Sequence, residues 1–112
     1  AVSFNGNKFS INHANVALTT PNSLGVLPIF EEYDHFNKFL ENWEENYKNF
    51  QLNPKKIPNK LISKESKNLF IKFRFVPEII DLNNKSQVEL NEIIIKQEKM
   101  RKIVRGWVGR LK

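Results

Sequence analysis

The sequence predicts a mainly helical fold: two long amphipathic helices, a basic linker, a short central strand or turn, and an extended N-terminal arm or hairpin. Apolar residues recur every three or four positions over residues 28–50 and again over 86–110, the spacing of one helix face. The first 28 residues carry one charge, Lys8, and 112 residues suffice for one small domain. We therefore divide the chain into a low-charge arm or hairpin at 1–28 and a small helical domain with a basic C-terminal helix at 29–112.

The N-terminal segment contains a hairpin signal. Residues 2–4 and 8–11 flank Asn5-Gly6-Asn7, and Asn-Gly between apolar positions favours a tight turn between two strands. An isolated two-stranded hairpin is marginal in water. We therefore expect this segment either to dock on the helices or to be an extended arm that becomes ordered on a partner. Residues 19–25 are expected to be irregular.

The first helix is predicted over residues 28–50. Pro28 suits its first turn, and the acidic residues just after it suit the positive end of the helix dipole. The helix holds half of the acidic residues of the chain, so its solvent face is predicted to be acidic. Its apolar stripe consists of Tyr33, Phe36, Leu40, Trp43, Tyr47 and Phe50.

A basic linker with two prolines is predicted over residues 51–68. In the next segment, 69–76, apolar residues alternate with Lys72 and Arg74, which favours a strand that Pro77 ends. A short helix is the alternative prediction for this segment, because Phe70, Phe73 and Arg74 would share one helical face.

The second long helix is predicted from about Ser86 to Arg110. Ser86 and Glu89 have the spacing of a capping box, in which each side chain bonds the backbone N–H of the other residue. Residues 96–112 hold seven cations and one acid. The apolar stripe consists of Leu90, Ile93, Gln97, Met100, Val104, Trp107 and Leu111, of which Gln97 is the only polar member.

The charge balance predicts a polyanionic or acidic partner. The chain has 18 Lys and Arg against 12 Asp and Glu, a net charge of +6. Cations grouped on a helix and in a linker are typical of phosphate binding. The candidate RNA-phosphate-binding residues are Lys55, Lys56, Lys60, Lys72, Arg74, Lys99, Arg101, Lys102, Arg105 and Arg110. The candidate rings for stacking on bases are Phe73, Phe75 and Trp107.

The segment 100–110 resembles the IQ motif, the calmodulin- or light-chain-binding helix with the pattern apolar-Gln-x-x-x-Arg-Gly-x-x-x-Arg/Lys. Four positions fit this pattern: Met100, Arg105, Gly106 and Arg110. Arg101 stands where the motif has Gln, and the resemblance covers 11 of 112 residues. It implies an acidic EF-hand partner that wraps the helix from about Leu90 to Arg110.

Several function classes are disfavoured by residues that the sequence lacks. It has no cysteine, which excludes disulfides, iron–sulfur clusters and thiolate zinc sites. His13 and His35 are far apart in sequence, so we expect neither a metal site nor a cofactor. Neither a Gly-rich phosphate loop nor a nucleophile elbow occurs, so we expect no enzyme. No apolar stretch approaches the roughly 20 residues of a transmembrane helix.

We expect a non-catalytic structural subunit of a ribonucleoprotein, an organellar ribosome being the favoured example. It would bind RNA, rRNA above all, through its basic segments, and neighbouring protein subunits through its arm and acidic helix. Ala1 in place of Met fits a removed leader, a trimmed chain or simple removal of Met. A removed leader would put the protein in the mitochondrial matrix; otherwise we expect it in the cytoplasm.

Two alternatives belong to other classes. The chain could be a calmodulin or light-chain target through its C-terminal helix. It could also be a subunit of a protein-only complex, in which the acidic helix is the docking face and the cations provide solubility.

Overall fold

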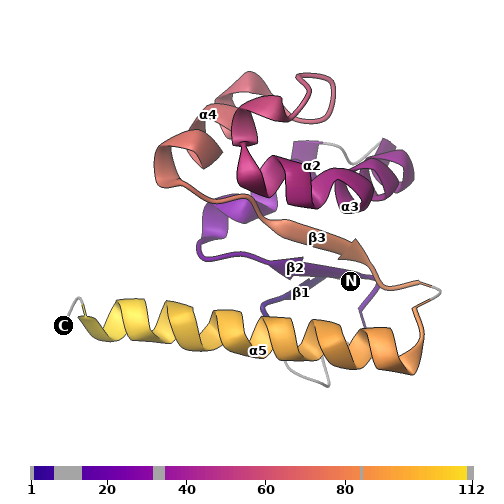
Figure 1. Cartoon of the computed structure of the whole chain (residues 1–112), viewed down its shortest axis with the longest axis vertical. Helices are drawn as coiled ribbons and strands as arrows, with labels where there is room; N and C mark the ends of the chain where they lie inside the picture. Colours follow the sequence, from indigo (N-terminus) through magenta and orange to yellow (C-terminus); the bar gives the residue numbers. More distant parts are fainter. Residues whose placement is uncertain (1, 7–13, 32–34, 84, 111–112) are drawn as a thin grey trace.

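The computed structural model describes residues 2–6, 14–31, 35–83 and 85–110, and over 105–110 only the helical backbone. The mainly helical class predicted from the sequence is confirmed, and a small three-stranded sheet accompanies the helices. In chain order (Figure 1) the elements are β1 Val2–Phe4, β2 Val16–Thr19, the 3-10 helix η1 Ser23–Val26, α2 Leu27–Glu31, α3 Phe36–Leu52, the 3-10 helix η3 Pro54–Lys56, α4 Lys64–Phe73, β3 Glu78–Asp81 and α5 Gln87–Arg110.

The sheet lies between two helical layers. Figure 1 shows α2, α3 and α4 on one face and α5 along the other. The strand order is β1-β2-β3, with β1 parallel and β3 antiparallel to the central strand. Val2 pairs with Val16, and Leu18 pairs with Ile79. Because successive side chains of a strand point to opposite faces, β2 contributes to both layers of packing.

The larger core lies between the sheet and the helices α3 and α4. Its buried members are Val16, Leu18, Phe39, Leu40, Trp43, Phe50, Ile57, Ile62, Phe70, Val76 and Ile79. Trp43 is at its centre, fully buried, with ring centroids 5.2 Å from Phe39 and 5.3 Å from Phe50. Its indole Nε1 donates to the carbonyl oxygen of Pro77 at 2.9 Å. This bond fixes α3 on the segment that leads into β3.

A smaller core lies between the sheet and α5. Its buried members are Ala17, Ile80, Leu82 and Ile93. Ala17 pairs with Ile80 across the sheet, and both residues therefore face α5 while their neighbours Leu18 and Ile79 face the other layer. From the apolar stripe predicted for the second long helix, Ile93 and the partly buried Leu90 thus pack in this core.

The predicted capping box at the start of α5 is confirmed. The backbone N–H of Glu89 donates to the Ser86 hydroxyl, and the backbone N–H of Ser86 donates to the Glu89 carboxylate, each at 3.2 Å. The predicted helix over 28–50 corresponds to α2 and α3, and residues 32–34, including Tyr33, lie outside the described residues. In the described part of the chain, no helix is long and apolar enough to cross a membrane.

The strand predicted over residues 69–76 is wrong. Residues up to Phe73 belong to α4, and the third strand follows Pro77 instead. The helical alternative prevails because α4 begins with a Ser63 cap, whose hydroxyl accepts from the backbone N–H of Ser66, and buries Phe70 completely in the larger core. Residues 69–76 therefore form the end of α4 and the turn after it, and β3, an edge strand of the sheet, begins only at Glu78.

The predicted hairpin falls partly outside the described residues. Its first half is β1, which pairs in parallel with β2. Its second half, residues 8–11, lies outside the part of the chain that the structure describes. The central strand β2 was not predicted, and all four of its residues are buried.

Candidate nucleic-acid interface

A cleft of about 730 Å³ opens between the end of α3, the turn between α4 and β3, and the middle of α5. The lining from α3 and η3 includes Tyr47, Lys48, Gln51, Leu52, Pro54 and Lys55. The turn after α4 contributes Arg74, Phe75 and Val76, and α5 contributes Lys96, Lys99, Met100 and Ile103. Three segments that are distant in sequence therefore build one site.

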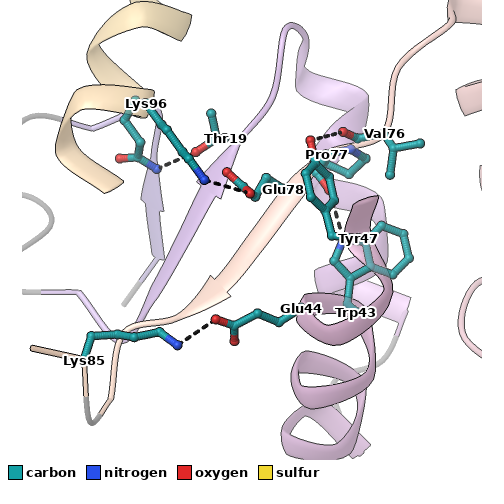
Figure 2. Close-up of polar contacts among 10 residues, drawn as sticks. Thr19, Trp43, Glu44, Tyr47, Val76, Pro77, Glu78, Lys85 and Lys96 are labelled. Carbon is teal, nitrogen blue, oxygen red and sulfur yellow. Dashed lines mark hydrogen bonds and ion pairs between the residues drawn. The ribbon is translucent and has the colours of Figure 1, made fainter. Parts of the chain in front are cut away.

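The cleft is strongly basic. Among the described residues that line it, the cations are Lys48, Lys55, Arg74, Lys96 and Lys99, and the only acid is Glu78. Lys96 Nζ lies 3.4 Å from the Glu78 carboxylate (Figure 2). No described carboxylate lies within 4 Å of the other four cations. Four positive charges thus remain unpaired within the described part of the chain.

Arg74 reaches the cleft from an unusual backbone conformation. Its φ of 57° and ψ of 50° place it in the left-handed region, where glycine is the usual residue at a helix end. The N–H groups of Arg74 and Phe75 both donate to the carbonyl oxygen of Phe70. The rings of Phe75 and Phe70 pack edge to face with centroids 5.1 Å apart. This hydrophobic contact typically accompanies such an ending and places the guanidinium-bearing residue at the cleft.

Two aromatic rings line the cleft and are held in place. The Tyr47 hydroxyl lies 3.5 Å from the carbonyl oxygen of Val76 (Figure 2). Burial, and then the negative charge of Glu78, raise the pKa of Tyr47 to about 12, so its hydroxyl stays protonated and neutral at physiological pH. Phe75 is half-buried against Phe70. The site therefore offers fixed ring surface beside unpaired cations.

The structure brings together four of the predicted site residues: Lys55, Arg74, Phe75 and Lys99. The predicted phosphate contacts Lys56, Lys60, Lys72 and Lys102 are exposed but do not line the cleft. Arg101 is half-buried, and its Nε atom is buried without a hydrogen-bond partner among the described residues. The side chains of Arg105, Trp107 and Arg110 lie outside the described residues.

The predicted stacking ring Phe73 lies away from the cleft. Its side chain is 50% exposed, and the Nζ atom of its neighbour Lys72 lies 5.4 Å from the ring centroid. This geometry is a cation–π contact at the surface of α4. Lys72 and Phe73 therefore contact each other, and neither lines the cleft.

Sequence reasoning missed Tyr47, Lys48 and Lys96 as site residues. Tyr47 and Lys48 lie on the helix whose solvent face was predicted to be acidic, and Lys38 and Lys48 are the only two lysines over residues 28–50. The sequence position of Lys48 could have indicated its place in the site, because it precedes the linker cations by less than two helical turns. Lys96 lies one helical turn before Lys99 and Met100 and therefore shares their face.

The described residues contain no group of three or more metal-ligating side chains. The Glu31 carboxylate accepts hydrogen bonds from Ser63 and Ser66. No family model, curated protein or solved structure matches the chain. The chemistry of the site is therefore derived from its own residues.

Proposed function

We propose that this chain is a non-catalytic structural subunit of a ribonucleoprotein, and that the basic cleft is one of its RNA-binding surfaces. The observation that supports the proposal is the set of four unpaired cations, Lys48, Lys55, Arg74 and Lys99, on one side of the molecule. Converging cations neutralise neighbouring phosphates of one strand and release their counterions, which gives affinity without sequence preference.

The C-terminal cations support the same proposal. If these cations stabilised the fold through ion pairs, carboxylates should lie beside them. Among the described residues, only Lys96 of this group has such a neighbour, whereas Lys99, Arg101 and Lys102 have none within 4 Å. The charges of Lys99 and Lys102, whose side chains are exposed, are therefore available to a partner.

The organellar ribosome stays our proposed assembly, with the mitochondrial matrix as the proposed location. The remaining predicted cations outside the cleft would then contact further phosphates of the same RNA. The acidic helix supports contacts to neighbouring subunits, because its residues Glu41 and Glu45 are exposed.

Binding of an EF-hand partner to the IQ-like helix would disrupt more of the fold than RNA binding at the cleft. A partner that wraps the helix from Leu90 to Arg110 would have to displace Ile93 and Gln97, which are buried against the sheet. RNA at the cleft leaves both residues in place. A calcium-dependent complex with an EF-hand protein would support this alternative.

RNA binding measured against salt concentration tests the proposal. The probe is a labelled single-stranded RNA of about twelve nucleotides, within the span that such surfaces cover. The double variant Lys55→Gln/Lys99→Gln removes two cleft cations. The control Lys38→Gln/Lys64→Gln removes two exposed cations from α3 and α4 that do not line the cleft.

We expect the cleft variant to lower the slope of log K against log salt by about 1.4, because each phosphate contact on a single strand contributes about 0.7. The control should keep the wild-type slope. Absence of RNA binding even at low salt would overturn the proposed function. Equal slopes for the two double variants would overturn the assignment of the cleft.

A further inference from the structure

The walls of the cleft combine its cations with apolar side chains that are unusually exposed. Leu52 at the end of α3 is 85% exposed, and Ile103 on α5 is 55% exposed. Both line the cleft, together with Ile71, Phe75, Val76 and Met100. Exposed apolar groups on two separate elements therefore converge on the same space as the cations.

This combination restricts the chemistry of the occupant. A surface that binds only phosphates needs no apolar walls. A surface that binds only an apolar peptide would leave Lys55, Arg74 and Lys99 desolvated without a counter-charge, which is unfavourable. A nucleotide satisfies both requirements, since its base has apolar faces and its phosphates are anionic.

We propose that the cleft binds an unpaired base of single-stranded RNA, with the base between its apolar walls and the flanking phosphates on Lys55, Arg74 and Lys99. This inference rests on the proposed function and adds to it the kind of RNA recognised. Tyr47 and Phe75 provide ring surface for stacking, and both are held by neighbours within the fold. The volume of the cleft lies in the range of ligand sites, about 300–1,000 Å³.

Double-stranded RNA does not fit this arrangement. Its bases are stacked and paired, and the deep major groove of an A-form helix excludes side chains. A base can enter the cleft only when it is unpaired and turned away from its neighbours. We therefore expect preference for single strands, loops or bulges over duplexes, with little dependence on sequence.

Three probes of equal length test the inference: a single-stranded RNA, the same RNA annealed to its complement, and an abasic oligomer that keeps the phosphates but lacks the bases. We expect the single strand to bind about 5- to 150-fold more tightly than the abasic oligomer, the range for stacking one base on aromatic side chains. The duplex should also bind more weakly than the single strand.

The outcomes separate the inference from the proposed function. Equal binding of the single strand, the duplex and the abasic oligomer would overturn the inference and leave the proposed function standing. No binding of any probe would overturn both. A free nucleoside monophosphate is a further competitor: if it displaces the RNA at equal nucleotide concentration, the site is one for free nucleotides and the inference is wrong.

Variants of the exposed apolar residues add an independent test. Leu52→Asn/Ile103→Asn changes the cleft walls, whereas the control Val88→Asn/Ile95→Asn changes two exposed apolar residues of α5 outside the cleft. The cleft variant should lose most of the preference for single-stranded over abasic RNA and keep its salt slope. The control should keep both. The single variant Leu52→Asn repeats the test at the most exposed of these side chains, and an unchanged preference there would contradict the inference.

Discussion

The side-chain oxygen of Gln97 accepts a hydrogen bond from the backbone N–H of Gly6 at 2.7 Å. The same oxygen accepts from the Ser3 hydroxyl at 3.2 Å, and the Gln97 amide donates to the carbonyl oxygen of Leu18 at 3.1 Å. Gln97 is fully buried. One side chain of α5 thus joins the helix to both β1 and β2. This explains why the apolar stripe of α5 contains one polar residue.

Replacing Gln97 by Met should destabilise the fold strongly. Met has a similar length but leaves the N–H of Gly6 and the buried hydroxyl of Ser3 without the acceptor that they share, and each unsatisfied buried group costs about 1–3 kcal/mol. We expect a loss of at least about 2 kcal/mol in the free energy of unfolding, measured by urea denaturation. The control Gln87→Met, at an exposed position of the same helix, should change it by less than about 0.5 kcal/mol. Equal losses for the two variants would contradict this role.

Glu31 at the end of α2 should stabilise the start of α4. Its carboxylate accepts from the backbone N–H of Ser63 at 3.0 Å, from the Ser63 hydroxyl at 2.7 Å and from the Ser66 hydroxyl. A negative charge at a helix N-terminus is favourable. We expect Glu31→Ala to lower the free energy of unfolding by about 1 kcal/mol, and the exposed Glu41→Ala on α3 to leave it nearly unchanged. A denaturant titration of both variants checks this, and a neutral effect of Glu31→Ala would show that the contact contributes nothing in solution.

The capping box gives α5 a defined dependence on pH. Hydrogen bonds from Ser86, that from its backbone N–H first, hold the pKa of Glu89 below its ordinary value of 4.5. Since the native pKa is the lower one, the stabilisation is fully present above about pH 4.5 and is lost as the pH falls through the native pKa. Glu89→Gln keeps a capping amide but no titrating group. Wild type should therefore exceed this variant in stability at pH 7, and the difference should vanish in acid; a pH-independent difference would contradict the prediction.

Local sequence signals predicted those parts of the fold that depend on neighbouring residues. Ser86 and Glu89 lie three positions apart, so their reciprocal bonds follow from helix geometry alone. The strand β2 escaped prediction because it is buried on both faces and therefore lacks the alternation that marks a half-buried strand. The segment before Pro77 was ambiguous because the alternation is short and Phe70, Phe73 and Arg74 would also share one face of a helix. Burial of Phe70 in the larger core, a tertiary effect, decides in favour of the helix.

The basic character of the candidate site was predictable from the sequence, but the set of residues that line it was not. The excess of cations indicated a polyanion, and Lys55, Arg74 and Lys99 were among the predicted residues. That these three line one cleft depends on how α3, α4 and α5 pack around the sheet, which no local pattern encodes. The same packing leaves Lys60 and Lys72 outside the cleft. Tyr47 was assigned to the apolar stripe of its helix, and its second role at the cleft followed only from the fold.

Arg74 should show opposite effects on stability and on RNA binding. A non-glycine residue in the left-handed region costs about 1–2 kcal/mol, part of which the entropy of a glycine offsets. Arg74→Gly should therefore leave the melting temperature unchanged or raise it. It should also lower the salt slope of RNA binding by about 0.7, the contribution of one phosphate contact.

The control Arg74→Ala removes the same guanidinium but keeps a side chain at the strained φ of 57°. It should lose the same amount of slope without gaining stability over wild type. Thermal denaturation and salt-dependent binding of both variants complete the comparison. If Arg74→Gly proved less stable than wild type, the arginine side chain would have a packing role. If instead both variants kept the wild-type slope, Arg74 would not contact phosphate. In the expected case, the chain keeps an arginine where glycine would suit the backbone better, because the guanidinium is needed at the cleft.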